Sequence, residues 1–538
     1  MDRLLLSGNE AIARGAWEAG CRVGTGYPGT PSTEILESLT TYEGVNTEWS
    51  VNEKVALEVG IGAALSGART LVTMKHVGMN VAADPLFTSS YIGVKGGLVI
   101  VTADDPSMHS SQNEQDNRNY AYHAKLPMLE PADSQEAKEF TKLAFEISEK
   151  YDTPVLLRST TRISHSQSVV TPGPRRELPP PEGFTRDIRK YVMIPANAKL
   201  RHVEVEKRLS RITADANEVE VNRIEMGDTR VGFITSGINY TYVRELYPEA
   251  SVLKLGMVHP LPQEMIHRFI ETVDRVFVIE ELDPFFEMRI KSWGFSVEGK
   301  EHLPVIGEFN PDRIREPLEK AGVASGKTIH AGLENHLRLP PRPPALCPGC
   351  PHRMIFQKLH DQNLKVTGDI GCYTLGALPP FSAMDTCVDM GASVTVGQGI
   401  EIAEGDAHQR DTVAVIGDST FAHSGITGLI NAAYNGRHGL VIVLDNGTTA
   451  MTGMQPNPFS GQRIDHSESF KLDYQKLAEA VGISSENYRM VDAYKSDDIE
   501  NAIDELREKS GLSLLVVKGT CVILRQKLKK AERKRSAA

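Results

Sequence analysis

Short apolar runs recur along the chain and are separated by stretches with helical spacing. Apolar runs of five to seven residues, bounded by turn residues, are typical of buried parallel strands. We predict such strands at 70–74, 97–102, 229–235, 251–255, 275–279, 412–416 and 439–444. The spacing and the small residues at 9–19 and 53–68 predict helices. Alternating strands and helices predict an α/β fold with doubly wound parallel sheets.

Proline-rich segments divide this pattern into three α/β domains. Residues 172–202 are rich in proline and lack regular periodicity, 207–225 is charged and predicted to be helical, and 340–344 is again proline-rich. Such segments are typical of connections between domains. We therefore predict a first α/β domain at 1–175, a linker at 176–225, a middle α/β domain at 226–338, a third α/β domain at 339–522 and a basic tail at 523–538.

Composition narrows the class of protein. With 40% apolar and 24% charged residues, the 538-residue chain is ordinary for a globular protein. A net charge of −11 argues against nucleic acid as a partner. No apolar run approaches the roughly 18 residues of a membrane-spanning helix, and the N-terminus does not resemble a secretory signal. These features predict a cytoplasmic protein without a membrane partner.

Two neighbouring predicted strands are each followed by polar residues that could bind a metal ion. Gly417-Asp418-Ser419 follows one strand, and Asp445-Asn446-Gly447-Thr448 follows the next. Parallel strands end at one edge of their sheet, so the Asp418 carboxylate and the Asn446 amide are expected to lie close together. With a backbone carbonyl they would form an oxygen site for Mg²⁺ and a diphosphate, which Gly417 lets approach the backbone. The alternative interpretation is two ordinary strand-end loops.

Cysteines gather in the third predicted domain, at Cys347, Cys350, Cys372, Cys387 and Cys521. Six cysteines in the whole chain are too few for a disulfide scaffold. A CxxC pair can bind zinc, form a redox disulfide or hold an iron–sulfur cluster. Four thiolates suit either a [4Fe–4S] cluster or structural zinc, so both interpretations stay open. Cys21 stands apart and is expected to be a buried apolar residue.

The segment Gly24-x-Gly26-x-x-Gly29 matches the dinucleotide fingerprint. Its predicted strand is only a few residues long, and the prolines at 28 and 31 lack the N–H donors that a pyrophosphate would need. We therefore do not expect a nicotinamide cofactor.

Several segments resemble one enzyme family. YPGTPS at 27–32 resembles the YPITPS segment of the 2-oxoacid:ferredoxin oxidoreductases, and the GDS and DN pairs resemble the GDG and NN signature of thiamine diphosphate enzymes, with Ser419 and Asp445 as departures. The segments at 74–80, 347–353, 417–421 and 448–453 more narrowly resemble the α subunits of indolepyruvate ferredoxin oxidoreductases. This resemblance spans almost the whole chain.

The resemblance implies that the first and third domains bind the pyrimidine and the diphosphate of thiamine diphosphate. The implied cofactor-binding residues are Gly417, Asp418, Ser419, Thr420, Asn446 and Thr448. Among these, Asp418, Asn446 and Thr448 are the implied Mg²⁺ ligands. The family's cysteine order also implies one [4Fe–4S] cluster on Cys347, Cys350, Cys372 and Cys521, although Cys387 could replace the last of these.

The same resemblance implies the catalytic residues. Glu53 matches the carboxylate that shares a proton with the aminopyrimidine ring and so activates the cofactor, although it could also be a surface helix residue. Thr30 matches the residue that contacts the substrate carboxylate. Lys75 and His76 are expected to hold the 2-oxoacid carboxylate or to protonate an intermediate, or else to support the site through hydrogen bonds from behind it.

The implied reaction is oxidative decarboxylation of an aryl 2-oxoacid, of the indolepyruvate or phenylpyruvate type. Coenzyme A would take the acyl group, and the cluster would pass electrons to ferredoxin or another acceptor. The implied partners are a smaller β subunit and, because we expect no C-terminal ferredoxin-like domain here, a separate acceptor that docks near the basic residues at 525–535. The rival class is a non-oxidative decarboxylase or carboligase. A non-catalytic scaffold is disfavoured because Glu53, Asp418 and Asn446 are all present.

Overall fold

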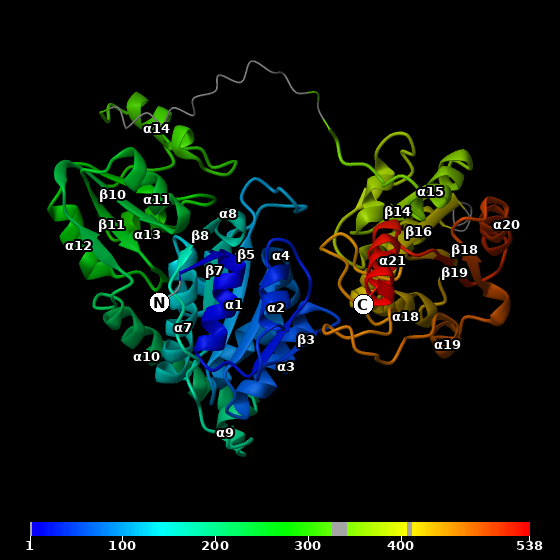
Figure 1. Cartoon of the computed structure of the whole chain (residues 1–538), viewed down its shortest axis with the longest axis horizontal. Helices are drawn as coiled ribbons and strands as arrows, with labels where there is room; N and C mark the ends of the chain where they lie inside the picture. The colour runs from blue at the N-terminus through cyan, green and yellow to red at the C-terminus, as the bar shows by residue number, and fades with distance from the viewer. Residues whose placement is uncertain (1–2, 325–339, 341, 406–410, 538) are drawn as a thin grey trace. The chain divides into compact units, whose positions relative to one another are not determined.

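The computed structural model describes residues 3–324, 340, 342–405 and 411–537 (Figure 1). Helices alternate with parallel strands, which confirms the predicted α/β fold class. The chain divides into two compact units, Met1–His336 and Leu337–Ala538, and each is described by itself. The predicted middle domain therefore belongs to the same compact unit as the first. The boundary expected between 338 and 339 lies outside the described residues.

A seven-stranded sheet forms the centre of the first unit, in the order β12-β6-β7-β5-β4-β2-β3. Its strands are β2 (Val23–Gly26), β3 (Asn46–Trp49), β4 (Thr70–Lys75), β5 (Leu98–Asp104), β6 (Met128–Leu129), β7 (Val155–Thr160) and β12 (Met257–His259). Neighbouring strands are parallel except β12, which pairs antiparallel with β6. A separate antiparallel pair joins β1 (Leu4–Ser7) to β8 (Gln167–Val170).

Among the described residues, eight helices accompany this sheet. They are α1 (Gly8–Glu18), α2 (Thr33–Leu39), α3 (Glu53–Leu65), α4 (His76–Val81), α5 (Ala83–Ile92), α6 (Arg118–Ala124), α7 (Ser134–Tyr151) and α8 (Thr161–His165). Two of them, α1 and α3, match the helices predicted at 9–19 and 53–68. A capping box begins α1, because Ser7 Oγ accepts from the Glu10 amide and the Glu10 carboxylate accepts from the Ser7 amide.

A four-stranded sheet forms the rest of the first unit, in the order β13-β10-β11-β9. Its strands are β9 (Arg223–Glu225), β10 (Asp228–Ser236), β11 (Ala250–Leu255) and β13 (Val276–Ile279). Its helices are α11 (Gly237–Leu246), α12 (Gln263–Glu271), α13 (Phe285–Ser292) and α14 (Pro311–Lys320). The two helices that precede this sheet, α9 (Ile188–Tyr191) and α10 (Pro195–Asp215), contact α5 of the first sheet. Ile234 and Leu253 share one apolar core with Leu86 and Ile100 of the first sheet. This shared core explains why both sheets lie in one unit.

The helix predicted at 207–225 is wrong at its C-terminal end. Helix α10 stops at Asp215, and 223–225 forms β9, which pairs antiparallel with β11. Pairing with a neighbouring strand outweighs the helical preference of a charged segment.

The second unit contains a six-stranded parallel sheet, in the order β15-β14-β16-β17-β19-β18. Its strands are β14 (Lys365–Gly368), β15 (Thr386–Cys387), β16 (Thr412–Gly417), β17 (Gly439–Asp445), β18 (Tyr488–Asp492) and β19 (Leu512–Lys518). Along β16, Val413 and Val415 face one apolar core, whereas Ala414 and Ile416 face another. Cores on both faces are the mark of a doubly wound sheet.

Helices of the second unit supply both cores and include a basic C-terminal helix. They are α15 (His352–Asp361), the 3-10 helix η1 (Cys372–Ala377), α16 (Ala392–Glu404), α17 (Asp418–Thr420), the π-helical η3 (Phe421–Gly425), α18 (Ile426–Tyr434), α19 (Tyr474–Ala480), η4 (Ser485–Asn487), α20 (Ser496–Arg507) and α21 (Val522–Ala537). The predicted basic tail is thus helical through residue 537 (Figure 1, red). Within the described part of the chain, no helix combines the length and the apolar character needed to cross a membrane.

Candidate functional site

The carboxyl edge of the second unit's sheet brings the predicted metal ligands together. Asp418 begins the helical segment directly after β16, and Asn446 directly follows β17, the adjacent parallel strand. The two strand ends touch, since the Gly447 amide donates to Asp418 Oδ2 over 3.1 Å. The register of two parallel strands is what places these polar residues side by side.

The Asp418 carboxylate is buried and held by three donors. Oδ1 accepts from the Ser419 amide at 2.9 Å, and Oδ2 accepts from the Gly447 amide and from Asn457 Nδ2, each at 3.1 Å. Burial, together with the nearby carboxylate of Asp445, raises the pKa of Asp418 to about 7. Sequence reasoning missed Asn457, which lies in a loop far beyond the strand end.

Asp445 adds an unsatisfied oxygen to this site. Its Oδ1 accepts from the Gly447 amide at 2.9 Å, whereas its buried Oδ2 has no hydrogen-bond partner. The ammonium of Lys518 lies 3.9 Å from Oδ2, beyond hydrogen-bonding distance. Two buried carboxylates without a hydrogen-bonded cation fit a divalent ion with oxygen ligands, such as Mg²⁺.

The side chain of Asn446 has a fixed orientation. Its Oδ1 accepts from the Thr448 amide at 3.0 Å, and its Nδ2 lies 3.3 Å from His352 Nε2. The Thr448 hydroxyl donates to the Gln455 carbonyl at 3.1 Å. Both Asn446 and Thr448 therefore belong to a tightly bonded turn at the end of β17.

Glycine is required at Gly417 and at Gly447 for different structural reasons. A Cβ on Gly417 would lie 2.5 Å from the Tyr373 ring, so the missing side chain makes room for that ring. Gly447 has a φ of 78°, and no atom lies within 4 Å of the position of a Cβ. The close backbone approach that we expected at Gly417 therefore fits Gly447 better.

The predicted hydroxyl residues after Asp418 both take part in hydrogen bonds. Thr420 Oγ1 donates to the Ile370 carbonyl at 2.9 Å, and Ser419 Oγ accepts from Thr449 Oγ1 at 2.9 Å. Thr420 thereby holds the loop after β14 against the start of α17, whereas Ser419 holds the turn after β17.

The four predicted cluster ligands line one cavity of about 90 Å³ at the same edge. These ligands are Cys347, Cys350, Cys372 and Cys521. Burial, together with the neighbouring thiols, raises the pKa of Cys350 and of Cys372 to about 11. Cys387 is exposed and does not line the cavity, so the structure favours Cys521 as the fourth member. Cys21 is fully buried, as expected.

The spacing of these thiols differs from that of a zinc site. In a tetrahedral site with Zn–S bonds of about 2.3 Å, neighbouring sulfur atoms lie about 3.8 Å apart. Among the described residues, the one group of three or more potential ligand atoms within 4.8 Å consists of Glu298, Glu301 and His302. No three of the four sulfur atoms therefore lie that close together. A [4Fe–4S] cluster needs one thiolate for each of its four irons, and the cavity supplies four thiols.

The cysteine cavity and the carboxylate site share the end of β17. The Cys521 amide donates to the Asn446 carbonyl at 3.0 Å, and the Gly519 amide donates to the Asp445 carbonyl at 2.9 Å. Asn446 and His352 also line the cysteine cavity.

Glu53 occupies a buried position in the first unit, at the start of α3. Asn52 caps this helix, because its side chain accepts from the Val55 amide at 2.9 Å. A Cβ on Gly78 would lie 2.7 Å from Glu53 Oε1, so the first turn of α4 packs directly on the carboxylate. Glu53 is therefore not the surface helix residue of the alternative interpretation.

Lys75 ends β4 close to Glu53 and Thr30. Its Nζ donates to the Ser110 carbonyl at 2.5 Å, and Ser110 Oγ donates to the Thr30 carbonyl at 3.4 Å. Burial lowers the pKa of Lys75 to about 8, although the charges of Asp105 and Glu53 oppose this shift. Three of the four predicted catalytic residues, Thr30, Glu53 and Lys75, thus lie at or just beyond the carboxyl ends of β2, β3 and β4.

His76 is fully buried and faces a backbone carbonyl. Its Nε2 lies 3.2 Å from the Asn113 oxygen, so Nε2 must carry the proton. Burial and the charge of Lys75 lower the pKa of His76 to about 4, which keeps the ring neutral at pH 7. Its hydrogen bond holds the loop at 106–115, which also contacts Lys75 through Ser110.

Asp105, which directly follows β5, anchors that same loop. Its Oδ2 accepts from the Ser110 amide at 2.9 Å and from Ser111 Oγ at 2.5 Å, and its Oδ1 accepts from Thr161 Oγ1 at 2.7 Å. In the sequence, the signal for this residue is the pair of carboxylates at 104 and 105, just beyond the predicted strand at 97–102.

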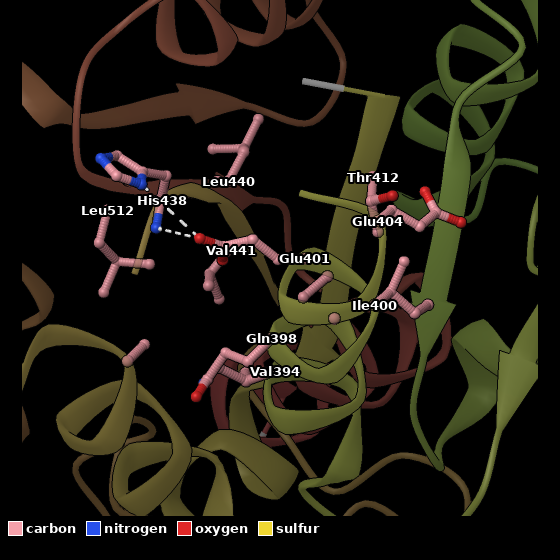
Figure 2. A pocket seen from close by; sticks show the side chains of 14 residues that line it. Val394, Gln398, Ile400, Glu401, Glu404, Thr412, His438, Leu440, Val441 and Leu512 are labelled. Carbon is pink, nitrogen blue, oxygen red and sulfur yellow. Dashed lines mark hydrogen bonds and ion pairs between the residues drawn. The ribbon is translucent and has the colours of Figure 1, made fainter. Parts of the chain in front are cut away.

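A second cavity lies at the opposite, amino edge of the sheet in the second unit (Figure 2). It measures about 30 Å³, which is room for little more than a single water molecule. The His438 amide donates to Glu401 Oε1 at 3.1 Å across it (Figure 2). None of the predicted site residues lines this cavity, so it does not belong to the candidate site.

Comparison with known proteins agrees with this geometry. Residues 14–228 match the family "Pyruvate flavodoxin/ferredoxin oxidoreductase, thiamine diP-bdg", and residues 369–517 match "Thiamine pyrophosphate enzyme, C-terminal TPP binding domain". The chain is 41% identical to indolepyruvate oxidoreductase subunit IorA of Archaeoglobus fulgidus, over 99% of this chain and 89% of that protein. It is 40% identical to the subunit of the same name from Thermococcus kodakarensis, over 97% of this chain and 86% of that protein.

A solved structure has a similar fold. It is the 2-oxoglutarate:ferredoxin oxidoreductase from Magnetococcus marinus with 2-oxoglutarate, coenzyme A and succinyl-CoA bound. The match has a TM-score of 0.50 at 17% identity and covers 59% of this chain and 65% of that one.

Proposed function

Because the chain belongs to the family of the indolepyruvate oxidoreductase IorA subunits, we propose that it oxidatively decarboxylates an aryl 2-oxoacid, of the indolepyruvate or phenylpyruvate type, to an acyl-CoA. The observation that carries this proposal is the meeting of a buried oxygen-ligand set and four thiols at one end of β17. The relatives named above are oxidoreductases, which favours oxidative chemistry over the non-oxidative decarboxylase or carboligase.

Thiamine diphosphate, when bound, supplies the carbon nucleophile and the electron sink for this reaction. We assign Mg²⁺ and diphosphate binding to Asp418, Asn446 and Thr448 at the end of β16 and β17. The orphaned oxygen of Asp445 and the open space at Gly447 support this assignment. Within the proposed domain division, this site belongs to 339–522.

Glu53 is the proposed proton-sharing group for the aminopyrimidine, within the pyrimidine-binding domain at 1–175. Its burial supports the role, since a carboxyl group away from water can hold a proton for the ring. The linker at 176–225 and the middle domain at 226–338 have no assigned part in the chemistry.

The 2-oxoacid is proposed to bind through its carboxylate at Lys75 and Thr30. An ammonium in a buried position attracts an anionic group more strongly than one in water. His76 contributes by holding the loop at 106–115, whose Ser110 carbonyl in turn holds Lys75.

The four cavity cysteines are proposed to hold one [4Fe–4S] cluster that accepts electrons one at a time. The gathering of four thiols around one cavity supports this proposal. Coenzyme A is the proposed co-substrate, because the acyl group left after oxidation needs a thiol acceptor.

A smaller β subunit and an electron acceptor such as ferredoxin are the proposed partners. The acceptor would dock at α21, which begins directly after Cys521. The described exposed cations of this helix are Arg525, Lys527, Lys529, Lys530 and Arg533. They suit a partner with an acidic surface.

The direct test is analysis of the anaerobically purified chain, alone and with its co-expressed smaller subunit. We expect thiamine diphosphate and Mg²⁺, about four irons and four sulfides per chain, and dye reduction that requires both indolepyruvate and coenzyme A. Carbon dioxide release without dye reduction would instead indicate the non-oxidative class.

A further inference from the structure

The amide of Asn446 can adopt only one of its two orientations. Its Oδ1 accepts from the Thr448 amide at 3.0 Å, and a flipped amide would bring two donors face to face there. Nδ2 therefore points at His352 Nε2, 3.3 Å away, and the imidazole nitrogen must accept. His352 is protonated on its other nitrogen in this arrangement.

His352 stands between the two functional elements of the second unit. It begins α15, directly after the Cys347–Cys350 turn, and is 3% exposed. Its backbone N–H hydrogen bonds to the thiol of Cys350, while its ring reaches Asn446. Both the ring and the amide are buried from bulk solvent.

We propose that His352 is a positioning residue for the Mg²⁺–diphosphate site, acting through the hydrogen bond that its Nε2 accepts from Asn446 Nδ2. This inference rests on the proposed function of Asn446 as a metal ligand. With Nδ2 engaged, Oδ1 keeps a free lone pair at the strand end, where Asp418 and Asp445 lie. The residue that touches the cysteine turn thereby also orients a ligand of the metal.

Loss of the acceptor should weaken metal binding measurably. A buried amide N–H without a partner costs enough to change an equilibrium by about 5- to 150-fold. The amide would lower this cost by turning away to another acceptor, and Oδ1 would then lose its direction toward the metal.

The experiment compares variants at this one position in the full chain. Isothermal titration measures thiamine diphosphate binding at saturating Mg²⁺, and a second titration varies Mg²⁺ at fixed thiamine diphosphate. His352→Gln places an amide oxygen near the former Nε2 and can still accept, whereas His352→Asn is one carbon too short and His352→Leu cannot accept. Ile355→Val, in the same helix, controls for loosened packing of α15.

We expect His352→Gln to keep Mg²⁺ and thiamine diphosphate affinity within about threefold of the parent, and His352→Asn and His352→Leu to lose about tenfold or more. Ile355→Val should lower the unfolding temperature without changing either affinity. If His352→Leu does not fold, the Gln and Asn pair carries the comparison.

Equal affinity in all His352 variants would overturn the inference while leaving the proposed function intact. Weakened binding in His352→Gln equal to that of His352→Asn would also overturn it, because packing alone would then explain the loss. A parent chain that binds no thiamine diphosphate with Mg²⁺ would instead refute the proposed function itself.

Discussion

Gly78 packs so closely on Glu53 that a Cβ at residue 78 would lie 2.7 Å from the carboxylate oxygen Oε1. The absent side chain therefore sets the depth at which the carboxylate sits beneath α4. A methyl group there must displace the Glu53 side chain or the first turn of the helix.

Gly78→Ala should impair cofactor activation more than cofactor binding. Displacing Glu53 removes a positioned proton carrier, which is typically worth about 10²- to 10⁴-fold in rate. Hydrogen–deuterium exchange at the C2 carbon of thiamine diphosphate should slow by at least about tenfold, as it should in Glu53→Gln. Gly62→Ala is the matched control, because no atom lies within 4 Å of its added Cβ. Unchanged exchange in Glu53→Gln would remove Glu53 from the mechanism.

Asp418→Asn should weaken thiamine diphosphate binding at limiting Mg²⁺. The change removes a charged oxygen ligand, and losses of about 10- to 100-fold accompany damage to a metal's supporting residues. Titrations over a range of Mg²⁺ concentrations measure the effect. Asp465→Asn removes an exposed carboxylate of the same unit and should change nothing. Parental affinity in Asp418→Asn would place the metal elsewhere.

Cys350→Ser should abolish bound iron and sulfide, together with the visible absorbance of the cluster. Cys387→Ser should keep both, because Cys387 is exposed and lies outside the cavity. Elemental analysis of anaerobically purified protein distinguishes the outcomes. One zinc and no iron in the parent chain would rule out the cluster.

Binding of the 2-oxoacid should weaken as pH rises through about 8. Burial lowers the pKa of Lys75 to about 8, so the ammonium is present below this pH and is lost above it. A carboxylate held by this ammonium predicts a KM that rises about tenfold per pH unit above pH 8. Lys75→Arg should flatten the profile because arginine stays charged. The same rise in Lys75→Arg would assign the titration to another group.

Salt should slow electron delivery to an acidic acceptor. Changing Lys527, Lys529 and Lys530 to Gln removes attraction at the surface of α21, and such changes act mainly on association rates. We expect about a tenfold slower association with an acidic ferredoxin at low salt and a shallower salt dependence. The control replaces three exposed lysines elsewhere in the unit, Lys365, Lys476 and Lys495. Identical salt profiles for the α21 variant and the parent would remove this helix from the docking surface.

The ends of β16 and β17 could be located from the sequence, because apolar runs followed by polar residues identify parallel strand ends. The adjacency of Asp418 and the segment after β17 follows from this pattern alone. The partners of those residues could not be foreseen in the same way. Tyr373 beneath Gly417, Asn457 against Asp418 and His352 against Asn446 all come from segments remote in the chain.

In the first unit, too, the sequence identifies the site residues but not the segments that hold them. Thr30, Glu53 and Lys75 were recognisable from local motifs, and the structure places them at neighbouring strand and helix ends. The loop at 106–115 has no such motif, and its attachment to Lys75 and His76 depends on backbone carbonyls that any residue could supply. Side-chain identity therefore could not reveal it.

Strand β12 completes the edge of the seven-stranded sheet although it lies far beyond β7 in the sequence. A recombinant fragment that stops near residue 225 would leave β6 with bare amide and carbonyl groups, which invite pairing with other chains. It would also uncover the apolar surface that Phe285, Phe286 and Ile290 cover. Anyone seeking a soluble piece that presents Glu53 should therefore extend it at least through Ser292, the end of α13.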